Sequence, residues 1–278
     1  MTYTTLISAQ QLAKHSHDSN LVIIDCRFSL ADSEAGYRSY RKGHIENARF
    51  AHLDKDLSSQ ITSTTGRHPL PNFNSLVKKL GQWGINNQSQ VIVYDDAYGA
   101  FASRLWWLLR CLGHQAVAVL DGGLAHWKAG LTSNLPIIRE KTFRAYLDPS
   151  LWLSATEISN ALARHSIQLI DARTAIRFSG EQEPIDPVAG HIPKAVNRAF
   201  QLNLADTGVF LPQIKLRQQF TTVLESFTPE QTVHMCGSGV TACHNLLAME
   251  HAGLSGSKLY AGSWSEWITN QNRSIATK

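Results

Sequence analysis

The sequence predicts an α/β protein built from two tandem copies of one domain, each a mainly parallel sheet with helices on both faces. Three observations support this prediction. Short runs of valine, isoleucine and leucine alternate with helical patterns along 278 residues. Continuous apolar strands separated by helices are typical of parallel sheets that are covered on both sides. The same motifs also occur twice, which indicates a duplicated domain.

The repeat consists of four pairs of segments at a nearly constant separation. That separation lies between 140 residues, from 119 to 259, and 147 residues, from 43 to 190. The stretch 135–150 has weak periodicity and two prolines, as a linker does. We therefore place a first domain at residues 1–138, a linker at 139–150 and a second domain at 151–278. The pairs are 21–27 with 168–173, 43–45 with 190–192, 91–95 with 232–236, and 119–127 with 259–267.

Within each domain the predicted order is a helix, a strand ending in Asp-x-Arg, a further strand, and a helix that ends at glycine. The opening helix of the second domain carries a capping box at Ser154 and Glu157. We expect the aspartate and arginine of each Asp-x-Arg to form a structural ion pair. These elements lie at 6–13, 21–27, 91–95 and up to Gly113 in the first domain, and at 154–162, 168–173, 232–236 and up to Gly253 in the second.

The strongest chemical signal is Cys236, which ends a predicted strand. Glycine, serine and glycine follow, and a helix is predicted from Ala242. Small residues let successive backbone N–H groups converge on one point, and a helix N-terminus adds partial positive charge. Such surroundings depress a cysteine pKa from about 8.5, so we expect a thiolate at neutral pH. The alternative is a free core cysteine; for Cys243, two helical turns further on, that interpretation is preferred.

The two domains differ at the position of this cysteine. The first domain has Asp95 where the second has Cys236, and its following loop is bulkier. A carboxylate cannot form a persulfide. Any sulfur chemistry is therefore assigned to the second domain, and the first is expected to be a non-catalytic scaffold.

Composition limits the classes of function. Hydrophobic residues make up 43% and charged residues 17%, and no apolar run approaches the roughly 20 residues of a transmembrane helix. The N-terminus lacks the pattern of a secretory signal, and four irregularly spaced cysteines suit neither a disulfide framework nor a metal site. We expect a cytoplasmic protein with no membrane association. A charge of +4 suits small anionic substrates but provides no basic stripe for nucleic acid.

Several motifs together identify a family. The loop 236–244 and the paired Gly-His-Ile segments at 43–45 and 190–192 are joined by 104–107, 120–123 and 262–267. With these motifs the chain resembles the tandem-domain rhodanese-like sulfurtransferases, which include thiosulfate sulfurtransferase and 3-mercaptopyruvate sulfurtransferase. The resemblance runs nearly end to end.

The resemblance implies a double-displacement reaction without metal or organic cofactor. The Cys236 thiolate takes sulfur from a small anionic donor and becomes a persulfide. An acceptor then removes that sulfur, and by family analogy it is cyanide, a small thiol or thioredoxin. Backbone amides of the loop would stabilise the sulfur; they belong to Gly237, Ser238, Gly239, Val240 and Thr241.

The family features disagree about the donor. Ser238 between two glycines resembles the mercaptopyruvate enzymes, in which such a serine works with a histidine and an aspartate that match His68 and Asp54. Arg177 matches the arginine that binds the substrate carboxylate. A second arginine of the mercaptopyruvate enzymes is replaced here by Ile185. The sequence favours 3-mercaptopyruvate, with thiosulfate as the alternative.

Other interpretations stay open beside these. His68 can be an exposed loop histidine, and Asp54 can belong to a solvated turn with its charged neighbours. Cysteine phosphatases share the strand–cysteine–loop–helix arrangement but need an arginine six positions after the nucleophile, where this chain has Ala242. A non-catalytic rhodanese-like binding module is a remote alternative that describes the first domain better than the second.

Overall fold

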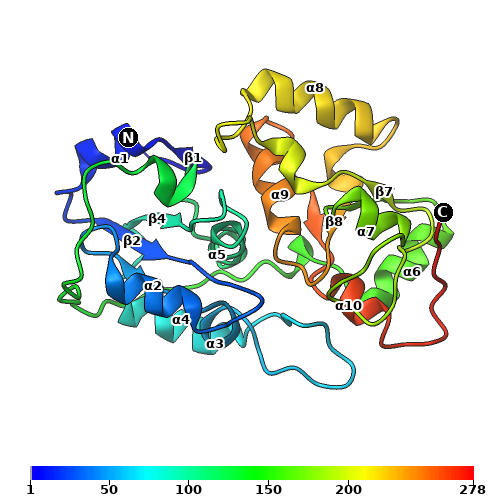
Figure 1. Ribbon diagram of the computed structural model, residues 1–278, viewed down its shortest axis with the longest axis horizontal. Helices are drawn as coiled ribbons and strands as arrows, with labels where there is room; N and C mark the ends of the chain where they lie inside the picture. The colour runs from blue at the N-terminus through cyan, green and yellow to red at the C-terminus, as the bar shows by residue number, and fades with distance from the viewer. Residues whose placement is uncertain (1) are drawn as a thin grey trace. The chain divides into compact units, whose positions relative to one another are not determined.

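The computed structural model describes residues 2–278, which divide into two compact units (Figure 1). The first unit consists of the residues up to Ser59, residues 70–148 and residues 207–209. The second unit consists of residues 60–69, 149–206 and 210–278. The short segment 60–69 therefore belongs to the second unit although it lies within the first half of the sequence.

The first unit contains a five-stranded sheet in the order β1-β5-β4-β2-β3, and its strand pairs are parallel. The strands are β1 (Leu6–Ile7), β2 (Leu21–Asp25), β3 (Arg49–Phe50), β4 (Gln90–Tyr94) and β5 (Val117–Leu120). The helices are α1 (Ala9–His15), α2 (Ala35–Lys42), α3 (Leu53–Asp56), α4 (Phe73–Gln82), α5 (Ala102–Cys111) and the 3-10 helix η1 (Gly123–His126).

The second unit repeats this design with four parallel strands in the order β7-β6-β8-β9. The strands are β6 (Gln168–Asp171), β7 (Val196–Asn197), β8 (Thr232–Met235) and β9 (Lys258–Leu259). The α-helices are α6 (Ala155–Ala163), α7 (Ala175–Ser179), α8 (Gln213–Leu224), α9 (Ala242–His251) and α10 (Ser263–Trp267); the 3-10 helices are η2 (Pro149–Leu151), η3 (Phe200–Asn203) and η4 (Pro229–Gln231).

The two sheets follow the same plan, which confirms the predicted fold class. The order β3-β2-β4-β5 corresponds to β7-β6-β8-β9. In the second unit an isolated parallel bridge between Trp152 and Leu259 stands where the first unit pairs β1 with β5. Successive residues of a strand point to opposite faces. All four residues of β8 are fully buried, so both faces of that sheet are covered.

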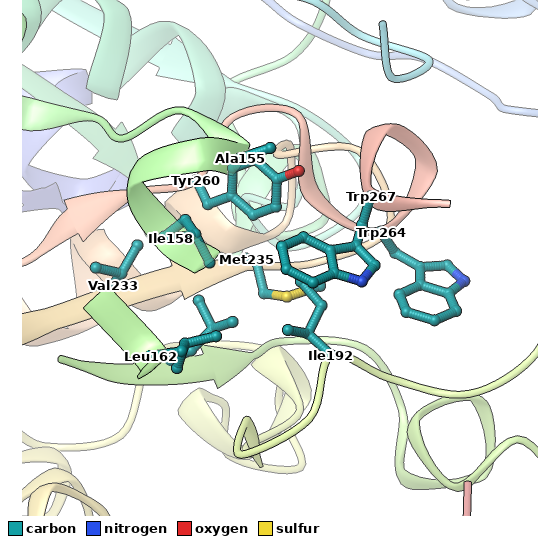
Figure 2. Packing of buried hydrophobic residues seen from close by; sticks show 10 residues of the cluster. Ala155, Ile158, Leu162, Ile192, Val233, Met235, Tyr260, Trp264 and Trp267 are labelled. Carbon is teal, nitrogen blue, oxygen red and sulfur yellow. The ribbon is translucent and has the colours of Figure 1, made fainter. Parts of the chain in front are cut away.

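The core of the second unit gathers side chains from β8, α6 and α10 (Figure 2). Trp267 lies beside Ile192 and Met235, so this tryptophan packs in the core. Burial of such side chains contributes about 1.5–3 kcal/mol each. The helix α6 begins with the predicted capping box, because Ser154 accepts from the amide of Glu157 and the glutamate side chain returns to the amide of Ser154.

The repeated Asp-x-Arg motifs form the expected buried ion pairs. Nη2 of Arg27 lies 2.6 Å from Oδ2 of Asp25, and Nη2 of Arg173 lies 2.7 Å from Oδ2 of Asp171. Each arginine also donates to the carbonyl of the glycine in its Gly-His-Ile segment, at 2.8 Å in the first unit and 2.7 Å in the second. In each repeat the ion pair thus connects the end of a strand to the Gly-His-Ile segment that follows it.

One buried histidine makes the second unit sensitive to acid. Nε2 of His234, on β8, lies 3.0 Å from Sδ of Met249, and its Nδ1 has no hydrogen-bond partner among residues 2–278. Burial, followed by the charge of Arg198, lowers the pKa of His234 to about 3. An unfolded chain binds that proton near pH 6.5. Stability therefore falls as the pH drops from about 6.5 toward about 3.

We predict that His234→Leu reduces this acid sensitivity. Relative to the parent, the free energy of unfolding of the variant should improve by up to about 1.4 kcal/mol for each pH unit between about 6 and about 4. Urea unfolding at several pH values measures the difference. The exposed His17 provides a control for the loss of a histidine side chain, and unfolding of His17→Gln is measured at the same pH values. If the difference in unfolding free energy between His234→Leu and the parent were the same at every pH, His234 would not be the cause of the acid sensitivity.

Candidate active site

The candidate site forms at the carboxyl edge of the second sheet. Asp171 pairs in register with Met235, so the chain following β6 and the chain following β8 leave the sheet side by side. Cys236 is the first residue after β8, and the loop 236–241 leads directly into α9. The edge beyond parallel strands is where α/β proteins place their chemistry.

The loop holds the sulfur of Cys236 against a backbone amide. The N–H of Gly239 donates to Sγ of Cys236 at 3.1 Å. The carbonyl of Gly239 accepts from Sγ of Cys243 at 3.4 Å, so the backbone of one residue contacts two sulfur atoms. Cys243 is fully buried, as predicted, and Cys236 is 2% exposed. The residue whose N–H points at Cys236 is therefore also held through its carbonyl by the second cysteine.

The start of α10 fixes the position of the loop. The N–H of Cys236 donates to Oγ of Ser263 at 3.0 Å, and its carbonyl accepts from the N–H of Trp264 at 3.0 Å. The carbonyl of Gly237 accepts from the N–H of Ser265 at 2.8 Å. Three hydrogen bonds from one short helix thus hold both residues at the start of the loop.

Segment 60–69 brings His68 to the loop. Nδ1 of His68 lies 2.7 Å from Oγ of Ser238, and both residues are buried. The amide of the preceding residue, Arg67, donates to Oγ of Ser265 at 3.0 Å. A Cβ on Gly66 would lie 2.5 Å from the carbonyl oxygen of Gly262, so only glycine allows this close approach. The structure therefore joins two of the predicted catalytic residues.

The third predicted member of that group is Asp54. Asp54 belongs to the first unit, on α3, and is exposed. Its amide donates to Nδ1 of His52 at 3.1 Å, in the N-cap of the helix. The catalytic role of Asp54 stays a prediction from the resemblance.

Two arginines lie beside the loop. A Cβ built on Gly237 would lie 2.8 Å from Nη2 of Arg67 and 3.4 Å from Nη2 of Arg177. Nε and Nη2 of Arg177 donate to Glu183, and Nη2 also lies 3.2 Å from Oδ2 of Asp186. Nη1 of Arg67 pairs with Oδ1 of the same aspartate. Burial lowers the pKa of Arg67, the charge of Cys236 opposes that shift, and the charge of Arg177 adds to it.

Sequence reasoning missed several members of this cluster. They are Arg67, Glu183 and Asp186, together with the serines of α10 that fix the loop. A signal existed for two of them, because Arg67 immediately precedes His68 and Asp186 immediately follows Ile185. Both charged residues are thus direct sequence neighbours of positions that the family resemblance had already indicated.

The corresponding loop of the first unit surrounds the carboxyl group of Asp95. Oδ1 of Asp95 accepts from the amides of Ala97 and Gly99 at 2.9 and 2.8 Å, and Oδ2 accepts from those of Phe101 and Ala102, both at 2.8 Å. Burial raises the pKa of Asp95, and the four amide donors oppose that shift. This repeat of the fold therefore directs four N–H groups at one acidic side chain where the second unit has its cysteine.

Residues 2–278 contain neither a cluster of metal-binding side chains nor a membrane-spanning helix. Across residues 2–278, no group of three or more histidine, cysteine, aspartate or glutamate side chains is placed to hold a metal ion. None of the helices in that range is long and apolar enough to cross a membrane.

Comparisons with known proteins agree with the duplicated architecture. The family model described as rhodanese-like domain matches residues 8–130 and 154–270. A probable 3-mercaptopyruvate sulfurtransferase of Pseudomonas aeruginosa is 48% identical over 282 residues, covering 100% of this chain and 99% of that protein. A putative thiosulfate sulfurtransferase, SseB, of Mycobacterium tuberculosis is 34% identical, covering 97% of this chain and 96% of that protein.

A solved structure is also similar over most of the chain. The crystal structure of SseA from Escherichia coli, a 3-mercaptopyruvate sulfotransferase with the rhodanese fold, matches with a TM-score of 0.81 and 31% identity. The matched region covers 95% of this chain and 100% of the Escherichia coli chain.

We predict that Gly239→Ala destabilises the second unit more than Gly253→Ala does. Both glycines have left-handed backbone, with φ of 76° and 71°, so each substitution costs about 1–2 kcal/mol in backbone strain. Only at Gly239 would the new methyl group overlap backbone, 2.2 Å from the carbonyl oxygen of Ala261. That overlap should add about 1–3 kcal/mol. Denaturant unfolding measures the loss of unfolding free energy in both variants. Equal losses would show that the loop can shift to accommodate the methyl group at position 239 without cost.

Proposed function

The chain belongs to the family of rhodanese-like domain proteins, and from this premise we propose that it is a 3-mercaptopyruvate sulfurtransferase acting through a persulfide on Cys236. The observation that supports it most is the amide of Gly239, 3.1 Å from Sγ at the end of β8. A donor N–H at that position favours a negatively charged sulfur. The full-length relative in Pseudomonas aeruginosa supports the choice of donor.

In the first half-reaction the Cys236 thiolate attacks the sulfur of 3-mercaptopyruvate. A sulfur–sulfur bond forms, the carbon–sulfur bond of the donor breaks, and its electron pair stays on carbon as the enolate of pyruvate. The proton of the donor thiol ends on that carbon, so pyruvate and the persulfide anion are the products. Ser238 and His68, 2.7 Å apart, supply a path for this proton.

The charges beside the loop favour a donor with one negative charge. Three carboxylates, those of Asp171, Glu183 and Asp186, form ion pairs with three arginines, and residues 237–239 carry no cation. The cluster is therefore close to neutral before a ligand binds. A monoanionic α-keto acid adds less repulsion there than thiosulfate, a dianion. Thiosulfate is the second candidate donor, supported by the similarity to SseB.

In the second half-reaction an acceptor removes the outer sulfur. Cyanide attacks it, thiocyanate leaves, and the Cys236 thiolate returns; a small thiol or thioredoxin would take the sulfur in the same way. The cycle requires reduced cysteines, and no disulfide joins any of Cys26, Cys111, Cys236 and Cys243. A reducing compartment such as the cytoplasm suits this chemistry.

We predict that the protein incubated with 3-mercaptopyruvate gains the mass of one sulfur atom and loses it again on addition of cyanide. Cys236→Ser should abolish both changes, because a hydroxyl cannot form the persulfide. Intact mass spectrometry measures the product, and Cys243→Ser is the matched control that should still gain sulfur. Sulfur gained by the Cys236→Ser variant would move the nucleophile to another cysteine. If the protein gained sulfur with thiosulfate but not with 3-mercaptopyruvate, thiosulfate would be the donor in place of 3-mercaptopyruvate.

We predict that Ser238→Ala and His68→Gln each lower kcat with 3-mercaptopyruvate by about 10²- to 10⁴-fold, since general acid–base catalysis is worth that much. Residues that act as one unit have non-additive effects. The double variant should therefore lose no more than the worse single variant. Steady-state kinetics measure all three, and multiplied losses in the double variant would show that the two side chains act separately.

A further inference from the structure

A cavity of the second unit lies at the amino edge of its sheet. Its volume is about 310 Å³, and its lining includes Leu162, shortly before β6, and Lys194, shortly before β7. These two strands run parallel, so the segments that precede them meet at the same edge of the sheet. Cys236 instead follows its strand, at the carboxyl edge. The cavity is therefore separate from the candidate active site.

Apolar side chains form a large part of the cavity wall. The indole of Trp267 lies beside Ile192 in the core of the unit (Figure 2), so the core continues directly into this wall. An apolar wall in a concave site favours a ligand with a hydrocarbon part. The apolar residues of the lining are Leu162, Ala163, Ile192, Pro193 and Trp267.

The last residues of the chain form another wall of the cavity. Residues 272–274 belong to the lining. Nε1 of Trp267 donates to the carbonyl of Ser274 at 3.0 Å. The backbones of His191 and Ala276 exchange two hydrogen bonds, of 2.8 and 2.9 Å. This wall is thus attached both to α10 and to the Gly-His-Ile segment, so the cavity is formed before a ligand binds.

Two cations line the cavity without a carboxylate partner. Nζ of Lys194 donates to the carbonyl of Leu162 at 3.0 Å. Nη1 of Arg273 donates to two carbonyls at the end of α10, at 2.9 and 3.3 Å. Within residues 2–278 neither cation forms an ion pair, and none of the lining residues is acidic. An ammonium has three N–H donors and a guanidinium five, so both cations keep donors for a ligand.

We propose that this cavity binds a small amphipathic carboxylate, whose head group contacts Lys194 and Arg273 and whose hydrocarbon part packs against Trp267. The inference does not depend on the proposed function, because pyruvate and 3-mercaptopyruvate lack such a hydrocarbon part. Small-molecule sites usually have volumes of about 300–1,000 Å³, and this cavity lies at the lower end of that range. It therefore suits a short chain, and octanoate serves as the probe.

The test titrates the full chain with octanoate, 1-octanol and acetate in a calorimeter. Octanoate should bind at least about tenfold more tightly than either of the others, because each buried methylene is worth roughly fourfold in affinity and 1-octanol lacks the charge. Lys194→Gln and Arg273→Gln should each weaken octanoate binding about 5- to 20-fold, since charged hydrogen bonds at partly exposed groups contribute less than buried ones. Lys194 is exposed, so its variant remains informative even if Arg273→Gln, which uncovers the ring of Trp267, lowers stability.

Two control variants separate this cavity from other cationic sites. Arg164→Gln removes an exposed arginine next to the lining residue Ala163, and Arg177→Gln removes an arginine of the candidate active site. Both should bind octanoate as the parent does. Loss of binding in Arg177→Gln would place octanoate at the active site and overturn the proposal. Equal weakening in Arg164→Gln, equal affinity for 1-octanol, unchanged binding by Lys194→Gln, or no octanoate binding by the parent would also overturn it.

Discussion

The hydrogen bond from the amide of Gly239 to the sulfur of Cys236 is the contact on which the site depends. This hydrogen bond requires a left-handed backbone conformation at Gly239 and a loop whose position relative to α10 is fixed. Ser263 and Ser265 provide that restraint, and Ser265 also holds the amide of Arg67. One five-residue helix therefore aligns the sulfur, the loop and the segment that carries His68. Electrostatic preorganisation of this kind acts without rearrangement when charge develops.

The two repeats use the same loop in opposite ways. In the first unit the side-chain oxygens of Asp95 accept hydrogen bonds from four backbone amides, so the loop binds an acidic group of the chain itself. In the second unit the cysteine side chain is shorter, and the loop between strand and helix has one residue fewer. The sulfur takes the amide of Gly239, and an added sulfur atom would extend further into the loop. The same loop thus surrounds an acidic side chain in one repeat and a cysteine in the other.

Local sequence patterns predicted the fold well, because its strands and helices depend on interactions between residues close together in the sequence. Apolar runs gave the strands, the capping box at Ser154 gave a helix start, and the turn after β8 marked Cys236. The proximity of His68 and Ser238 came from the resemblance alone, since 170 residues separate them. Arg67 was missed because its place depends on segment 60–69 joining the second unit and on Asp186, 119 residues away. No periodicity encodes such a contact.

The paired charges of the arginine cluster explain how one site can serve both halves of a two-step reaction. Unpaired arginines would bind any anion strongly and would retain the pyruvate that the first step releases. Pairing with Glu183 and Asp186 leaves geometry rather than net charge to select the ligand, because Nη2 of Arg67 and Nη2 of Arg177 lie only 2.8 and 3.4 Å from a Cβ built on Gly237. Charge-assisted hydrogen bonds still favour a well-placed carboxylate. Under the proposed function, the donor would be held while its sulfur moves, and the keto acid would leave before the acceptor attacks.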